Sequence, residues 1–406
     1  MTGRLAWRNL GRNRRRTLLT VAAVFFATFL MVFMRGLQLG TYDFFIRQST
    51  RLSTGYLQVQ HPDYLDRRSL RQSFRLTDSL FARIRTTPGV TGAAPRLESG
   101  GLISNRATSY GVRLLGIDPA YEPDVTDFPT RLVEGRMPAT TRPLEIVAGY
   151  RLLENLGASV GDTLVLLAET YGGFLTSRFA VVVGALRIGY EVHDRSLVLL
   201  PLAALQDLLE TGNRVTAVAV AVRRNADVPV VRDRLEARLD STLVVRTWEE
   251  LMPELRQAIE LDNVSGLLFL FMLLIVVAFG VLNTVLMSVL ERSREFGVLL
   301  ALGMPNERLL RVVLAEAALV VLIGLVLGSL AGFGVNTYLI RHPITLGGEL
   351  ARLYEYYGFL PVLTSSVAPE IFLRTALRVL VIAGLAILYP LWHVLRLEPL
   401  KGIRYT

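Results

Sequence analysis

The side chains that most often build catalytic centres are few in this sequence and lie far apart. Cysteine is absent, and the four histidines are His61, His193, His342 and His393. The sequence contains no His-Glu-x-x-His motif and no cysteine-bearing metal motif. We therefore expect no catalytic residues, no metal-binding residues and no cofactor-binding residues in this chain.

The pair His193-Asp194 is the one neighbouring His/Asp pair that could be a fragment of a catalytic triad. Two adjacent polar residues in a surface loop are a far commoner arrangement. We therefore favour a surface loop here.

A nucleotide-binding loop of the Walker A type is excluded by lysine usage. Such a loop needs Gly-Lys followed by Ser or Thr, so that the ammonium reaches the nucleotide phosphates. The only lysine is Lys401, within Leu400-Lys401-Gly402. If the protein performs ATP-driven work, the ATPase must be a separate subunit that binds ATP and Mg.

The most informative charged segment is ERSREFGVLLALGMPNERLLRVVLAE, from Glu291 to Glu316. Charged residues are followed by an apolar run, and Gly303 and Pro305 then supply a stop and a turn. The pattern predicts a short helix that joins two apolar segments and could dock on a partner. An ordinary helical hairpin with a solvated charged face explains the same pattern on physical grounds alone.

Four apolar segments set the architecture of the chain. They cover residues 18–40, 264–290, 312–340 and 374–395, and each is near or above the roughly 20 residues that cross a bilayer. With 51% hydrophobic residues, the chain is too apolar for an ordinary soluble protein. We predict four transmembrane helices; the rival reading of the first segment is a cleaved signal peptide.

Charge asymmetry predicts the orientation. Basic residues number six before the first span, four between the second and third and three after the fourth, against two between the third and fourth. The positive-inside rule places both termini in the cytoplasm. The net charge of +9 is thereby explained by membrane orientation, and no nucleic-acid partner is expected.

Between the first two spans, residues 41–260 alternate short β-like runs with short amphipathic helices. This alternation predicts a large α+β domain outside the cytoplasm. Residues 1–17 read as a basic, amphipathic cytoplasmic segment, 291–311 as a cytoplasmic loop, 341–373 as a second outer loop and 396–406 as a cytoplasmic tail. The helix expected at 248–261 is either a stalk that continues into the second span or a helix that lies on the membrane surface.

Two features of the third span could have structural roles. Glu316 is costly if it faces lipid, so we expect it to meet an arginine or the membrane interface. Gly324, Gly328 and Gly332 recur every four residues and predict a close-packing face, within the four helices or across a dimer. Glycine is also common in membrane helices generally, and the sequence favours neither explanation.

The segment from Glu291 to Glu316 closely resembles the signature of the FtsX-like, or MacB-type, ABC transporter permeases. The matching residues are Glu291, Arg292, Arg294, Glu295, Gly297, Ala301, Gly303 and Glu316. The opening LAWRNLGRNRRRTLLT and the ending LRLEPLKGIRY look like the ends of that family. GYLQVQHPDYL, GVRLLGIDP, EGRMPATTRPLEIVAGYRLLENLGASVGDTL and WEELMPELRQAIELD look most like its lipoprotein-releasing LolC/LolE branch.

The resemblance implies a permease subunit in the inner membrane of a bacterium with two membranes. Its partners would be two copies of a cytoplasmic ABC ATPase, a second permease copy or a similar heterodimer partner, membrane lipids and a periplasmic lipoprotein carrier. The ATPase-coupling loop would include Met304 and Pro305 beside the matching residues above. ATP hydrolysis in the partner would drive movements of the periplasmic domain that release lipoproteins.

Two other functions fit the sequence. One is mechanotransmission of the MacB or FtsX type for efflux or peptide export, within the same fold. The other is a membrane-anchored binding or sensor protein that works with no ATPase.

Overall fold

The computed structural model describes residues 14–106, 108–139, 141, 143–189, 191–302, 304–356 and 360–395. The chain divides into two compact units. The helical unit comprises the described parts of Met1–Tyr42, Ala258–Ile344 and Val362–Thr406, and the inserted unit comprises Asp43–Gln257 and Thr345–Pro361.

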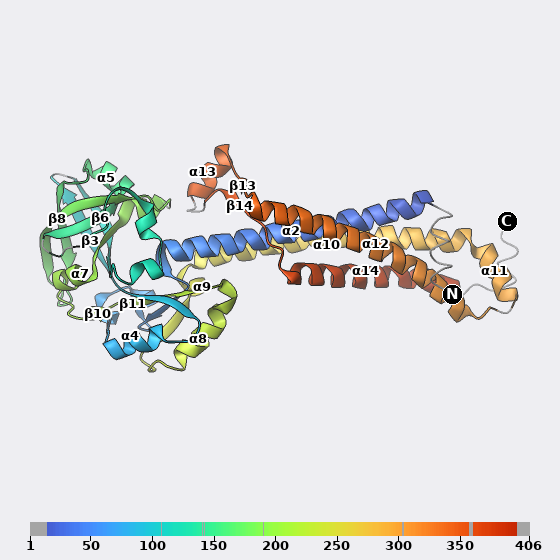
Figure 1. The fold of residues 1–406 in the computed structure, drawn as a ribbon, viewed down its shortest axis with the longest axis horizontal. Coiled ribbons are helices and arrows are strands. Elements are labelled where there is room, and N and C mark those ends of the chain that lie inside the picture. The colour runs from blue at the N-terminus through green and yellow to red at the C-terminus, as the bar shows by residue number, and fades with distance from the viewer. Residues whose placement is uncertain are drawn as a thin grey trace. The chain divides into compact units, whose positions relative to one another are not determined.

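Four long helices form the helical unit: α2 (Arg14–Ser49), α10 (Pro253–Glu291), α12 (Asn306–Arg341) and α14 (Pro369–Leu395), which Figure 1 shows as long rods. Each is long enough to cross a bilayer and contains a window of mean hydropathy between 2.2 and 2.8. Large apolar side chains such as Leu18, Phe271 and Leu373 remain exposed along them, as lipid-facing surfaces require. The four predicted spans are confirmed, and the chain is an integral membrane protein.

Residues 248–261 were expected to form either a stalk that continues into the second span or a helix that lies on the membrane surface. The course of helix α10 shows that the stalk is correct. The short helix α9 (Trp248–Leu251) ends at Leu251, Met252 follows it, and Pro253 then begins α10, which continues without interruption to Glu291. Proline suits this first helical position because the amide it lacks would have no partner inside the helix. The stalk and the second span are therefore one helix of 39 residues.

The inserted unit is built on a ten-stranded mixed sheet in the order β12-β1-β11-β3-β4-β9-β6-β8-β5, with β7 paired to β3 and β8. Its strands are β1 (Leu57–Gln60), β3 (Val90–Asn105), β4 (Thr108–Ile117), β5 (Leu132–Gly135), β6 (Leu144–Gly149), β7 (Thr163–Glu169), β8 (Leu175–Leu186), β9 (Leu197–Pro201), β11 (Ala217–Val222) and β12 (Val244–Thr247). Its main helices are α4 (Asp78–Arg85), α5 (Tyr150–Leu156), α6 (Glu191–Ser196), α7 (Leu202–Leu208) and α8 (Val228–Glu236). The predicted α+β class is confirmed.

Smaller elements complete the chain. They are η1 (Thr50–Thr54), α3 (Tyr64–Arg67), η2 (Leu70–Gln72), β2 (Phe74–Arg75), η3 (Glu122–Asp124), η4 (Phe128–Arg131), β10 (Arg214–Val215), η5 (Asn225–Asp227), α11 (Ser293–Ala301), β13 (Ile344–Thr345), α13 (Gly348–Tyr356) and β14 (Val362–Leu363). Of these, η1 is a π-helical turn that directly follows α2.

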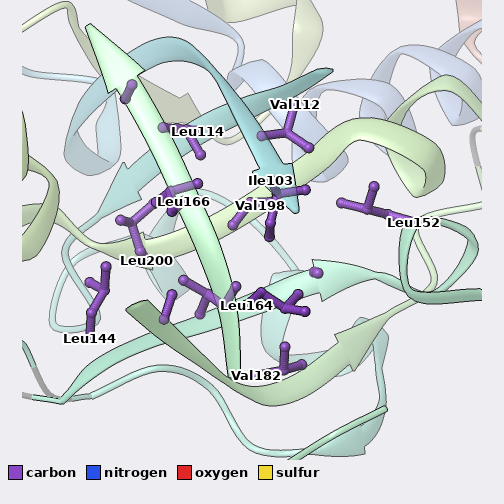
Figure 2. Packing of buried hydrophobic residues seen from close by; sticks show 14 of the residues in the cluster. Ile103, Val112, Leu114, Leu144, Leu152, Leu164, Leu166, Val182, Val198 and Leu200 are labelled. Carbon is purple, nitrogen blue, oxygen red and sulfur yellow. The ribbon is translucent and has the colours of Figure 1, made fainter. Parts of the chain in front are cut away.

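Both faces of the central strands are buried, which explains their nearly continuous apolar sequences. In β9, Val198 and Leu200 belong to one buried cluster, whereas Leu197 and Leu199 belong to another on the opposite face. Figure 2 shows the first cluster, in which Leu152 of α5 packs with side chains from strands β3, β4, β6, β7, β8 and β9. This core holds the sheet together without disulfides, because the chain contains no cysteine.

Strand β3 was not expected from the sequence, although it is the longest strand of the sheet. It contains Pro95, Gly100 and Gly101, residue types that are rare inside strands. Pairing with β11, β4 and β7 overrides these local preferences.

Candidate functional site

The connection between α10 and α12 contains the short helix α11, and one arginine organises it. Arg292 follows the last residue of α10, and its Nη1 donates to both carboxylate oxygens of Glu316 on α12, at 2.9 and 3.0 Å. Its Nε donates to Glu295 on α11 at 3.4 Å, and its guanidinium lies 5.0 Å from the centroid of the Phe296 ring. We call Arg292, Glu295, Phe296 and Glu316 the Arg292 cluster.

Phe296 anchors α11 to the transmembrane helices. Its side chain is 1% exposed and packs with Val289 of α10 and with Leu309 and Val313 of α12. Together with the Arg292–Glu316 ion pair, this packing fixes α11 to α12 from two sides. Helix α11 is therefore connected to α12 at two places.

The opposite side of α11 is exposed. Arg294, Val298 and Leu302 follow at intervals of four residues, which places them on one side of a helix. Val298 is 47% exposed and Leu302 is 80% exposed. We call Arg294, Val298 and Leu302 the docking face; an apolar exposed helix face of this kind is suited to a groove on a protein partner.

The remaining residues of the predicted coupling loop are distributed around α11. Gly297 is buried, Met304 is half-buried, and Glu291, Ala301 and Pro305 are exposed. Gly303 lies outside the described residues. The structure thus joins Arg292, Glu295 and Glu316 in one cluster, and it adds Phe296, Val298 and Leu302, which the sequence signals only through the apolar run after Glu295.

The glycine face of α12 packs against α2. A Cβ at Gly324 would come within 2.7 Å of Val24, one at Gly328 within 2.6 Å of the Phe25 carbonyl oxygen, and one at Gly332 within 2.6 Å of Val32. The three glycines therefore allow α2 and α12 to approach closely inside one chain. The close-packing face was expected either within the four helices or across a dimer, and in the structure it lies within the four helices.

A polar network between α2 and α10 was not anticipated. Arg35 donates to Gln38 at 2.6 Å and to Asn263 at 2.7 Å. Gln38 and Tyr42 in turn donate to the Asp262 carboxylate, at 2.9 and 2.6 Å. The network joins residues more than 200 positions apart, and no local sequence signal reports such a pairing.

The surface-loop interpretation of His193 and Asp194 is wrong, since both residues belong to helix α6. The Asp194 carboxylate is 3% exposed and accepts hydrogen bonds from the amides of Ile188 and Gly189, at 2.7 and 3.1 Å. Burial raises its pKa, and burial with the nearby positive charge of Arg113 lowers the pKa of His193 to about 3. These two hydrogen bonds hold the segment at Ile188 and Gly189 against helix α6. A structural role therefore explains the His193-Asp194 pair.

One short motif has the sequence pattern of the nucleophile elbow of hydrolases, Gly-x-Ser-x-Gly. Residues Gly157 to Gly161 read Gly-Ala-Ser-Val-Gly and so match Gly-x-Ser-x-Gly. A nucleophile elbow joins a strand to a following helix, whereas this segment follows helix α5 and precedes strand β7. The motif therefore lacks the structural context of a hydrolase.

Comparison with known proteins identifies both parts of the chain. Residues 17–238 match the model of the MacB-like periplasmic core domain, and residues 267–399 match that of the FtsX-like permease C-terminal domain. The chain is 26% identical over 335 residues to the lipoprotein-releasing system transmembrane protein LolC of Xylella fastidiosa (strain 9a5c), covering 79% of each protein.

It is also 23% identical over 339 residues to LolE of Haemophilus influenzae, again covering 79% of each protein. A crystal structure of the periplasmic region of MacB from Actinobacillus actinomycetemcomitans matches 53% of this chain and 95% of its own, with 16% identity and a TM-score of 0.36. By its two domain matches, the chain belongs to the FtsX-like ABC transporter permeases that carry a MacB-like periplasmic core domain.

Proposed function

We propose that this permease subunit releases lipoproteins from the inner membrane, using energy from a separate cytoplasmic ATPase. The lipoprotein substrate is suggested by relatives named for lipoprotein release that match the chain over 79% of its length. The observation that carries the proposal is the arrangement of α11. Its docking face is exposed, and its opposite side is fixed to α12 through Phe296 and Arg292.

The proposed orientation places α11 and both termini in the cytoplasm and the inserted unit in the periplasm. The larger number of basic residues flanking the first span, the α10–α12 connection and the C-terminus supports it. In this orientation α11 faces the compartment that contains ATP. Two ATPase copies, which bind ATP and Mg, would act on a pair of permease chains, either identical or similar.

The role of α11 is tested by co-purification with the ATPase partner. Charged side chains at Val298 and Leu302 cannot enter an apolar groove, so Val298→Asp/Leu302→Asp is expected to abolish ATPase binding. Both side chains are exposed, so the variant should fold normally. Val230→Asp, at an exposed valine in the inserted unit, is the matched control and should retain the ATPase.

Unchanged ATPase recovery with the double variant would contradict the assignment of α11 as the coupling helix. A triple replacement of Glu295, Gly297 and Gly303 tests the same assignment through the sequence motif. In that variant, loss of binding supports the assignment.

A surface for the periplasmic carrier is proposed on the inserted unit. Strand pairing joins Leu102 of β3 with Leu167 of β7, and Val165 of β7 with Phe179 of β8, so these side chains and Leu175 lie on one side of the sheet. We call Leu102, Val165, Leu167, Leu175 and Phe179 the apolar face. Leu175 is 74% exposed and Phe179 is 75% exposed, which is unusual for a water-facing strand.

Removing this apolar surface should impair transfer to the carrier and leave ATP hydrolysis intact. The variant Leu175→Ser/Phe179→Ser is compared with Val230→Ser, which changes an exposed apolar residue on helix α8. We expect loss of carrier binding only in the former. Equal carrier binding by both variants would place the carrier elsewhere.

A further inference from the structure

The end of helix α2 is attached to the sheet through a glycine. The π-helical turn η1 ends at Thr54, and Gly55, with φ of 74°, connects it to strand β1. Glycine adopts this conformation readily and restricts the chain least of all residues. If the backbone were the only connection, α2 could pivot at Gly55 relative to the sheet.

A buried side-chain contact joins η1 directly to strand β3, in addition to the backbone connection through Gly55. Arg96 of β3 donates from Nη1 to the carbonyl oxygen of Ser53 in η1, and from Nη2 and Nε to the two carboxylate oxygens of Glu122. Thr126 donates to the same carboxylate at 2.7 Å. The side chains of Arg96 and Glu122 are only 1% and 2% exposed.

The burial of the Arg96–Glu122 ion pair indicates that it fixes the position of the groups it contacts. A buried ion pair often adds little net stability compared with apolar residues of similar size, whereas it accepts only one geometry. Here Glu122 orients the guanidinium, and the guanidinium reaches the η1 backbone. A second contact supports the same region from the surface, where the Asp127 amide donates to the Arg51 carbonyl oxygen at 2.9 Å.

Strand β3 leads from Arg96 to the apolar face. At Arg96 the strand is paired on both sides, with Ala217 of β11 and Ile117 of β4. Six residues further along the same strand is Leu102, a distance of about 20 Å at the usual rise of about 3.3 Å per residue. Strand β4 pairs with β3 over this whole stretch, and β7 pairs with it from Gly101 onward, so a continuous ladder of hydrogen bonds joins Arg96 to Leu102.

We propose that Arg96 is a positioning residue that fixes the end of α2 to strand β3, so that movement of α2 displaces the apolar face. The inference rests on the proposed function, because it assigns a route from the transmembrane helices to the carrier surface. Gly55 alone would let α2 pivot, and Arg96 restrains this movement together with the buried Leu52 and the Arg51–Asp127 ion pair.

The test replaces the whole contact so that no buried charge is left without a partner. The variant is Arg96→Met/Glu122→Met/Thr126→Val in the full chain, assembled with its ATPase in proteoliposomes. Arg151→Met/Glu154→Met, which removes an exposed ion pair on α5, is the control. The readouts are the lipoprotein released for each ATP hydrolysed, and hydrogen exchange at the Gly55 and Asp127 amides.

We expect the triple variant to hydrolyse ATP at the normal rate, to release about tenfold less lipoprotein per ATP and to exchange faster at both amides, while β3–β4 amides are unchanged. The control should match the unaltered protein in all readouts. Unchanged exchange at Gly55 and Asp127 would overturn the fixing role of Arg96. Faster exchange with normal release per ATP would overturn its role in transmission.

The two proposals can fail separately. If the unaltered complex releases no lipoprotein with ATP, the proposed function is wrong, and the exchange measurement still decides whether Arg96 fixes α2. If the unaltered complex is active and the triple variant is equally active, only the inference about Arg96 fails.

Discussion

At the scale of single residues, Arg292 is the residue whose replacement should have the largest effect, because it contacts both α11 and the transmembrane helix α12. Replacing Arg292 with Met removes the two hydrogen bonds that its guanidinium donates to the carboxylate of Glu316, which is 14% exposed. Losing hydrogen bonds between charged groups costs about 1.5–3 kcal/mol. We therefore expect the unfolding midpoint of the full chain in detergent to fall clearly.

The double variant Arg292→Met/Glu316→Met should recover part of that stability, since it removes both charges of the pair. It should nevertheless couple ATP hydrolysis less well, because α11 then loses its contact through Arg292 and keeps the packing of Phe296. A thermodynamic cycle of the two single variants and the double variant measures the interaction. Additive losses would show that the two side chains do not stabilise one another.

His193 predicts a pH dependence for the inserted unit. Its native pKa is lowered to about 3, whereas an exposed histidine titrates near pH 6.5. Between these values the unfolded chain binds a proton that the native chain does not bind. Stability should therefore fall as the pH decreases from 7 towards 4, by at most about 1.4 kcal/mol per pH unit.

The comparison of His193→Asn with the unaltered chain isolates this effect. Asp194, whose pKa is raised, acts in the opposite direction and is common to both proteins. The unfolding midpoint of the full chain should depend less on pH in the variant. Parallel pH profiles for the two proteins would contradict the assigned pKa.

At the scale of elements, the contact of α2 with α12 depends on the absence of side chains at three glycines. In Gly328→Val the added atoms would overlap Phe25, Thr28 and Phe29 of α2. Overpacking of this kind usually costs about 1–3 kcal/mol. Gly334→Val is the matched control on the same helix, because a Cβ there meets no atom within 4 Å.

We expect a lower unfolding midpoint in detergent for Gly328→Val and little change for Gly334→Val. The same ranking should appear in the amount of chain recovered from membranes. Equal midpoints for the two variants would mean that α2 and α12 are not closely packed in the membrane.

The elements differ in how far the sequence predicts them. The four spans follow from uninterrupted apolar runs, and helix α5 has local signals in its apolar periodicity and in the glycines on either side of it, Gly149 and Gly157. Strand β3 was missed because Pro95, Gly100 and Gly101 obscure its pattern. The Arg292–Glu316 contact was partly foreseen from the cost of an acid in a span, whereas Arg96 and the Arg35 network depend on distant pairings.

At the scale of the whole molecule, each part of the chain has one proposed function. We propose that helix α11 receives the ATPase, that the transmembrane helices carry the movement, and that the inserted unit presents the apolar face to a carrier. The family is established by its domain matches, and lipoprotein release is the proposed use of that family's architecture.

The most direct test reconstitutes the chain, its permease partner if one is required and its ATPase in proteoliposomes that contain a lipoprotein. Transfer of the lipoprotein to a soluble carrier is then measured with and without ATP. We expect ATP-dependent transfer that disappears in Val298→Asp/Leu302→Asp. Sustained ATP hydrolysis by the intact complex, with all lipoprotein remaining in the membrane, would contradict it.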